Sequence, residues 1–174
     1  GDLDGMFAFG ANVSNMGARI TYTEIQQRSY IPINLRVGPS LTLDIDEYNQ
    51  VMFTFDLNKL LVPTPPIYLR DSAGQPVTDD VTGEYVIDEG KDPNRPVVSG
   101  MFGSFSDAPG GFKEEFHEIN YSVGAEYWYD QQFAIRGGFF YEHPTKGNRK
   151  YITVGAGLRY NVFGLDFSYL IPLE

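Results

Sequence analysis

The sequence predicts an all-β fold. We expect an antiparallel transmembrane β-barrel, with about seven of its strands in this chain and a long extracellular loop that contains short helices. Apolar and polar residues alternate along seven stretches, and no charged residue falls on the apolar side of any of them. The stretches run to about ten or twelve residues, which suits a tilted strand crossing a bilayer, whereas strands of soluble proteins average about 5–6. Short and long connections also alternate, as in outer-membrane barrels.

The composition of the chain argues against several classes of function. The chain has 174 residues, no cysteine and a net charge of −10. This length suits a single domain over 1–174, with an insert at 59–116. The charge argues against a nucleic-acid partner, which needs a basic surface, and the lack of cysteine excludes disulfides and thiolate metal sites. No apolar run is long enough for a transmembrane helix. We expect no cofactor and no metal.

The first five strands are expected at 3–14, 34–45, 50–58, 118–129 and 133–142. In a strand, every second side chain points to the same side of the sheet. The apolar sides hold Leu3, Phe7, Phe9, Ala11 and Val13; Leu35, Val37, Leu41, Leu43 and Ile45; Val51, Phe53, Phe55 and Leu57; Ile119, Tyr121, Val123, Ala125, Tyr127 and Tyr129; and Phe133, Ile135, Phe139 and Tyr141.

Two further strands are expected within 150–174. Even positions carry the apolar residues over 152–162, and odd positions carry them over 165–173. A two-residue turn at Phe163-Gly164 explains this change of phase, because glycine at the second turn position accepts the positive φ of a type I′ hairpin.

The apolar sides are assigned to lipid rather than to a protein core. Tyrosines cluster near strand ends, where the aromatic girdles of membrane barrels lie. The alternative, a large soluble antiparallel sheet, would not need strands of this length. These tyrosines are Tyr121, Tyr129, Tyr141, Tyr151, Tyr160 and Tyr169.

The connections predict an orientation. Those at 46–49, 130–132 and 163–164 are short, and those at 24–32, 59–116 and 143–149 are longer. Outer-membrane barrels have short periplasmic turns and long external loops, so the last strand is expected to end outside, at Glu174. Bacterial barrels have an even number of strands, so at least one closing strand is missing. The chain is therefore expected to be part of a longer protein, or a half whose partner lies elsewhere.

Charged residues fall on the opposite side of the strands, which is predicted to face the lumen. The 130–132 turn places Glu126 opposite Arg136, and the predicted last turn pairs Asn161 with Asp166 and sets Arg159 diagonal to Asp166. We interpret these charges as pairs that fill a barrel interior, since buried charges need partners; the alternative is a selectivity ring. The predicted lumen charges are Arg36, Asp56, Glu126, Arg136, Arg159 and Asp166.

The insert at 59–116 holds the candidate partner-binding residues. Its first part, 59–69, is apolar and rich in proline, which favours an extended segment of the kind that partner proteins recognise. The next part, 70–97, is acidic and is predicted to be a mobile external loop. The last part has phenylalanines at helical spacing on both sides of a Pro-Gly-Gly break, which predicts two short helices that either plug the pore or present an apolar patch. The candidates are Leu60, Leu61, Val62, Pro63, Pro65, Pro66, Met101, Phe102, Phe105, Phe112 and Phe116.

No catalytic constellation is evident, and we expect that the protein is not an enzyme. His117 and His143 lie near the outer ends of neighbouring strands, next to Glu118 and Glu142. A metal or acid–base pair there is the alternative to two solvated rim histidines.

Three stretches resemble one known family. "FDLNKLLVPTPP" (55–66), "SGMFGSFSDAPGGFKEEFHEINYSVGAEYWYD" (99–130) and "KGNRKYITVGAGLRYNVFGLDFSYLIP" (146–172) are similar to PorV, also called LptO. This family comprises outer-membrane barrels of the type IX secretion system and is distantly related to the FadL fatty-acid transporters. The resemblance implies a FadL-like barrel of about fourteen strands, of which this chain looks like the C-terminal half without the last strand.

The resemblance also implies a function. PorV-type proteins collect secreted cargo by its C-terminal domain at a large outer-membrane translocon barrel. They then deliver the cargo to a cell-surface sortase complex, which attaches it to lipopolysaccharide. Such a protein is a shuttle in the bacterial outer membrane, in contact with outer-membrane lipid, and not a catalyst. The alternatives are a FadL-like transporter of hydrophobic molecules and a lipopolysaccharide-deacylation factor.

Overall fold

The computed structural model describes residues 4–20 and 29–173, and the chain divides into two compact units. The first comprises Gly1–Asn12, Arg36–Lys59 and Ile119–Glu174, and the second comprises Val13–Leu35 and Leu60–Glu118. The second unit therefore takes in nearly all of the 59–116 insert. It also includes 13–35, which the sequence pattern did not link to the insert.

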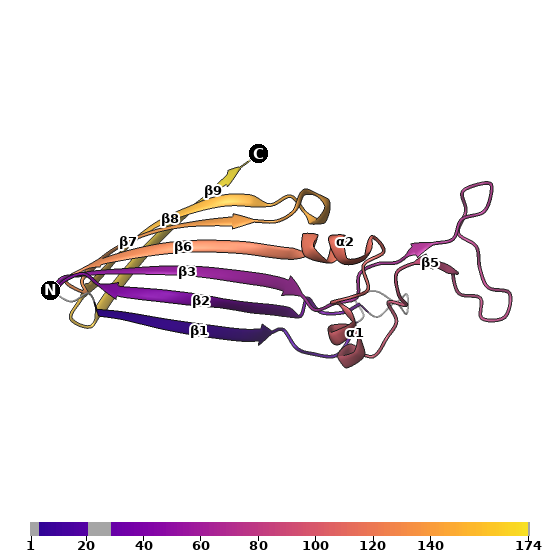
Figure 1. Ribbon diagram of the computed structural model, residues 1–174, viewed down its shortest axis with the longest axis horizontal. Coiled ribbons are helices and arrows are strands. Elements are labelled where there is room, and N and C mark those ends of the chain that lie inside the picture. Colours follow the sequence, from indigo (N-terminus) through magenta and orange to yellow (C-terminus); the bar gives the residue numbers. More distant parts are fainter. Residues whose placement is uncertain (1–3, 21–28, 174) are drawn as a thin grey trace. The chain divides into compact units, whose positions relative to one another are not determined.

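The first unit is a seven-stranded sheet, and it confirms the predicted all-β class. The strands lie side by side in chain order, as Figure 1 shows, and pair antiparallel from β3 to β9 through β6, β7 and β8. Each expected strand is present. They are β1 (Asp4–Ser14), β2 (Asn34–Asp44), β3 (Asn49–Leu60), β6 (Ile119–Tyr129), β7 (Phe133–Tyr141), β8 (Lys150–Tyr160) and β9 (Phe163–Leu173).

The last turn differs from the prediction. Tyr160 pairs with Phe163, so the turn is Asn161-Val162 rather than Phe163-Gly164. Asn161 supplies the positive φ, 52°, which asparagine tolerates better than most residues. The predicted pairing of Asn161 with Asp166 is therefore wrong, and Asp166 lies opposite Gly157.

This shift of the turn leaves the two faces of the hairpin unchanged, because a displacement by two residues preserves the alternation. Leu158 lies opposite Leu165 instead of Tyr169, and all three residues remain on the apolar side. Leu3 and Glu174, which the predicted strands included, lie outside the described residues.

The sheet is open. Among the described strands, β1 and β9 form its two edges, so these seven strands do not close on themselves. Within residues 4–20 and 29–173, no helix has the length and apolar character needed to cross a membrane.

One face of the sheet is apolar and uncovered in this chain. Phe55, Val123, Phe139, Ile152 and Ile171 form a row across five strands, joined by direct pairing. All five are exposed, from 38% to 47% of their surface. By contrast, the buried apolar residues among those described, apart from Pro66, are Ile33, Leu61, Ala108 and Ala134, of which Ala134 alone lies in the sheet. The apolar face thus needs a partner from outside this chain.

Aromatic side chains border this face at both ends. Near the end with the long connections, the ring of Tyr121 lies 6.5 Å from that of Phe55 and 6.4 Å from that of Tyr141. Near the short turns, the rings of Tyr48 and Tyr129 are 6.4 Å apart. The stretch of β6 from Tyr121 to Tyr129 spans about 27 Å at about 3.4 Å per residue. This is close to the height of about 25 Å typical of the apolar band of membrane barrels.

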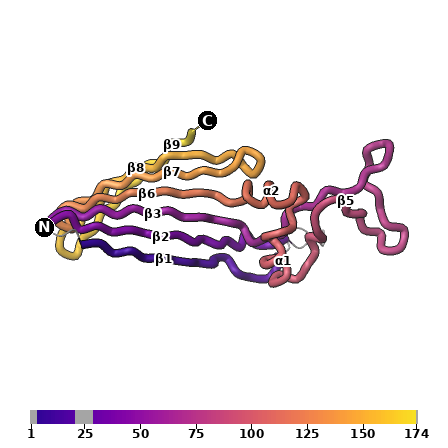
Figure 2. Tube along the Cα trace, in the orientation of Figure 1, coloured from indigo at the N-terminus to yellow at the C-terminus, as the bar shows by residue number. Residues whose placement is uncertain are grey.

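The second unit contains short elements. They are β4 (Ile67–Tyr68), which pairs with β5 (Ile87–Glu89), and two helices, α1 (Val97–Gly103) and α2 (Gly111–His117). The helix α2 contains Phe112 and Phe116, as their spacing predicted, whereas α1 contains Met101 and Phe102 but ends at Gly103, before Phe105. Between β4 and β5 the chain forms two loops, visible in Figure 2. In these loops Asp71 and Asp79 each accept backbone N–H groups, so the acidic stretch at 70–97 has defined turns.

Candidate docking surface and polar face of the sheet

A buried carboxylate organises the second unit. The side chain of Asp107 is inaccessible to solvent, and its Oδ2 lies 2.5 Å from Nη2 of Arg95. Oδ1 accepts the backbone N–H of Thr64 at 3.4 Å. Asp107 therefore links the proline-rich segment to the stretch before α1, which lies far from it in sequence.

A second carboxylate fixes the loop between the helices. Oε1 of Glu115, in α2, accepts the backbone N–H groups of Asp107 and Ala108 at 2.7 and 2.8 Å. The neighbouring Glu114 accepts the N–H of Gly110 at 2.7 Å through Oε2. Charge-assisted bonds of this kind are stronger than neutral ones, so the loop is held against its own helix.

Glycine at two positions leaves room for the side chains that pack on α1. A Cβ at Gly103 would lie 2.1 Å from Nη1 of Arg95, and one at Gly100 would lie 2.7 Å from the hydroxyl of Tyr30. The same Tyr30 hydroxyl donates a hydrogen bond to the carbonyl of Arg95. Arg95 thus lies between the helix and the buried Asp107, and the helix position depends on both.

This polar framework presents four exposed aromatic rings, which we call the phenylalanine set. Phe102 is 74% exposed and Phe112 is 77% exposed, while Phe105 and Phe116 are about half exposed at 49% and 50%. The rings of Phe112 and Phe116 meet edge to face at 4.8 Å. Large apolar side chains held outward by buried charges are typical of protein contact surfaces.

The other candidate partner-binding residues differ in accessibility. Leu60 and Pro65 are exposed, and Val62, Pro63 and Met101 are half-buried. Leu61 and Pro66 are buried, and the N–H of Leu61 bonds to the carbonyl of Ile33. The last two residues support the segment from inside and do not offer a surface to a partner.

On the polar face of the sheet, the charges form a connected network. Arg136 pairs with Glu126 directly opposite, and its Nη1 lies 2.6 Å from Oδ1 of Asp166. Asp166 also pairs with Arg159, at 2.7 Å. The network joins β6, β7, β8 and β9, and its two acids and two bases balance in charge.

Trp128 completes this network and was not among the predicted site residues. Its indole N–H donates to Oε1 of Glu126 at 2.5 Å. The guanidinium carbons of Arg136 and Arg159 lie 5.5 and 5.7 Å from the centre of its ring, within reach of cation–π attraction. The sequence holds a signal for this placement, because Trp128 follows Glu126 by two residues in β6 and therefore lies on the same face of the sheet.

The two remaining predicted lumen charges lie elsewhere in the sheet. Nε of Arg36 donates to Oδ1 of Asn58 at 2.8 Å, and Asp56 lies opposite Ser122. That the polar face borders a lumen remains a prediction.

Small residues occupy the middle of the polar face. Gly124 and Gly138 lie opposite each other, next to Thr54 and Thr153 on the flanking strands. A Cβ at Gly124 would meet the Thr54 hydroxyl at 2.9 Å, and one at Gly138 would meet that of Thr153 at 2.7 Å. The depression over these strands is open and is bordered by Glu126 and Arg136.

The rim between β7 and β8 is held by an ion pair. Glu142 is 5% exposed, and its two oxygens accept bonds from Nε and Nη2 of Arg149, both at 2.8 Å. Hydrogen bonding to Arg149 lowers the pKa of Glu142 below its usual value, so this carboxylate is ionised at neutral pH. Nδ1 of His143 lies 2.9 Å from the hydroxyl of Thr145.

These contacts bear on the acid–base alternative. Glu142 is engaged by Arg149, and Oε1 of Glu118 accepts the hydroxyl of Thr64 at 2.7 Å. His117 ends α2 in the second unit, whereas His143 belongs to the first. Across the described ranges, no group of three or more His, Cys, Asp and Glu side chains is arranged to hold a metal ion.

Comparison with known families adds an independent line of evidence. Residues 1–67 match the family described as the type IX secretion system protein PorV. No curated protein matches the chain. The matched region runs through β1, β2 and β3 and includes 55–66, one of the three stretches on which the sequence resemblance rests. The first 67 residues of this chain are therefore similar to the PorV family of type IX secretion system proteins.

Proposed function

We propose that this chain belongs to an outer-membrane component of the type IX secretion system that binds and passes on secreted proteins. The observation that carries the proposal is the uncovered apolar face of the sheet, with aromatic side chains at both ends and charge pairs on the opposite face. In water such a face is unfavourable, whereas in a bilayer it is the surface that lipid covers. The similarity of residues 1–67 to PorV indicates that the secretion system is type IX.

In this proposal the strands form part of a FadL-like barrel wall, with lipid on the apolar face. The short turns lie on the periplasmic side and the long connections outside the cell. The second unit is then extracellular, and its phenylalanine set is the docking surface. Its partners would be a large translocon barrel, the C-terminal domains of secreted cargo and the cell-surface attachment complex.

We propose a binding role and not a catalytic one. Glu118 and Glu142, the acids beside the two rim histidines, have structural partners in Thr64 and Arg149, which leaves neither as an obvious proton acceptor. The transport alternative needs an apolar ligand cavity. The depression on the polar face is open and bordered by an ion pair, which favours the binding role.

The proposal is tested by affinity purification of the tagged full-length protein from its own outer membrane in mild detergent. We expect a translocon barrel or secreted cargo with the C-terminal domain to co-purify, identified by mass spectrometry. Purification with lipid alone, while secretion is active, would contradict a docking function. Fatty acid retained in place of protein would favour the transport alternative.

A further inference from the structure

Lys150 places a positive charge at the border of the apolar face. Over the described residues of β3 and β6 to β9, the apolar side carries charge at Lys59 and Lys150 alone. Both lie at the strand ends from which the long connections leave. Lys59 is 6% exposed, whereas Lys150 is half-buried. Lys150 is therefore the charge on this side that a surrounding molecule can reach.

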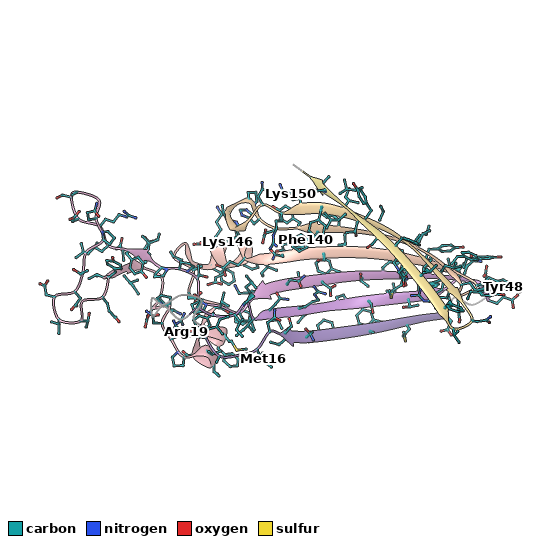
Figure 3. All side chains as sticks on the ribbon, turned by 180° about the vertical axis from the view of Figure 1, so that it is seen from behind. Met16, Arg19, Tyr48, Phe140, Lys146 and Lys150 are labelled. Carbon is teal, nitrogen blue, oxygen red and sulfur yellow. The ribbon has the colours of Figure 1, made fainter. Side chains whose placement is uncertain are left out.

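The position of Lys150 coincides with an aromatic border. Lys150 lies directly opposite Tyr141, which lies opposite Tyr121. Its ammonium nitrogen is 5.6 Å from the centre of the Tyr141 ring. Figure 3 shows Lys150 and Tyr48 at opposite ends of the sheet. A lysine at such a border covers apolar surface with its stem and keeps its ammonium among polar headgroups.

The surrounding charge favours an anion. The sequence has no acidic residue between Glu142 and Asp166, although the chain as a whole carries a net charge of −10. Lys146 and Lys150 both lie near the β7–β8 connection, as Figure 3 shows. Arg149 is engaged by Glu142, and the half-buried Lys150 is the base at this border of the apolar face that can attract an anion.

We propose that Lys150 binds the phosphate of an anionic lipid headgroup, with the acyl chains of that lipid on the apolar side of β7 to β9. The next row of that face, Phe139, Ile152 and Ile171, would contact the chains. The inference rests on the proposed function in one respect, because it needs lipid on this face. Beyond the proposed function, the inference specifies an anionic headgroup and names Lys150 as the residue that selects it.

The test is a native mass spectrometry titration of the full-length protein in detergent with phosphatidylglycerol or phosphatidylcholine. For Lys150→Gln we expect the first phosphatidylglycerol to bind about fivefold more weakly, the contribution typical of one basic residue near an anionic surface. Phosphatidylcholine binding should not change, and Lys150→Arg should restore phosphatidylglycerol binding. Lys113→Gln, on exposed α2, is the matched control for lost charge.

Each other outcome overturns the inference. Equal weakening in Lys150→Gln and Lys113→Gln would show a general charge effect. Unchanged phosphatidylglycerol binding in Lys150→Gln would contradict a contact between Lys150 and the headgroup phosphate. Complete displacement of the lipid by inorganic phosphate would show that the site binds the free anion. If the unaltered protein bound neither lipid, the proposed lipid-facing surface itself would fail. A different result, binding of both lipids with equal affinity, would contradict only the role of Lys150.

Discussion

Replacing Phe102 and Phe112 together with serine is expected to abolish co-purification of the partner protein while the sheet stays intact. Both rings are about three-quarters exposed, so their removal takes little from folding. At a protein interface, aromatic anchors of this kind contribute about 2 kcal/mol or more each. That corresponds to about 30-fold in Kd for each ring. Pull-down from solubilised membranes measures the loss, and circular dichroism checks the sheet.

The control for this variant is Val81→Ser with Tyr85→Ser. These residues are 93% and 55% exposed and lie in the same unit, outside the phenylalanine set. They should leave the association unchanged. An equal loss in both variants would show that exposed apolar area in general, and not the phenylalanine set, carries the binding.

Asp107→Asn is expected to loosen the second unit without altering the sheet. The substitution keeps the volume but leaves the Arg95 guanidinium, 17% exposed, without its counter-charge. Removing one partner of a buried pair costs about 3 kcal/mol. Local opening should then be about 100-fold more frequent, seen as faster amide hydrogen exchange over α1 and α2.

An exposed acid of the same unit provides the comparison for Asp107→Asn. Asp80→Asn makes the same chemical change in the loop between β4 and β5 and should leave exchange in both helices unchanged. If exchange over α1 and α2 were also unchanged in Asp107→Asn, the buried pair would not be what holds the helices in place. Partner binding should weaken along with the exchange, since the phenylalanine set depends on that framework.

The strands could be predicted because their signal is local. A strand that is apolar on one side shows it at every second residue, and this fixed the seven strands and their faces. The last turn was misplaced because Phe163-Gly164 contains the usual turn residue. Asn161 instead takes the positive φ, and nothing local distinguishes the two choices, since both keep the same side chains on the apolar side.

The framework of the second unit could not be predicted in the same way. Asp107 bonds to Thr64 and Glu115 bonds back to the Asp107 backbone, and such contacts follow from folding of the insert and not from a periodic pattern. The phenylalanines were found because their helical spacing is local. Leu61 and Pro66, which look equally apolar in sequence, are buried, and sequence alone gave no reason to separate them from the exposed residues.

The most direct test of the account asks which face of the sheet meets lipid. The chain has no cysteine, so single cysteines can be placed at the neighbouring positions Val154 and Thr153, on opposite faces of β8. Val123 and Ser122 offer the same comparison on β6. In intact outer membranes, a water-soluble thiol reagent should label Thr153→Cys and Ser122→Cys and spare Val154→Cys and Val123→Cys, with all four labelled after denaturation. Labelling of the Val154 and Val123 variants as fast as their neighbours would contradict the assignment of the apolar face to lipid.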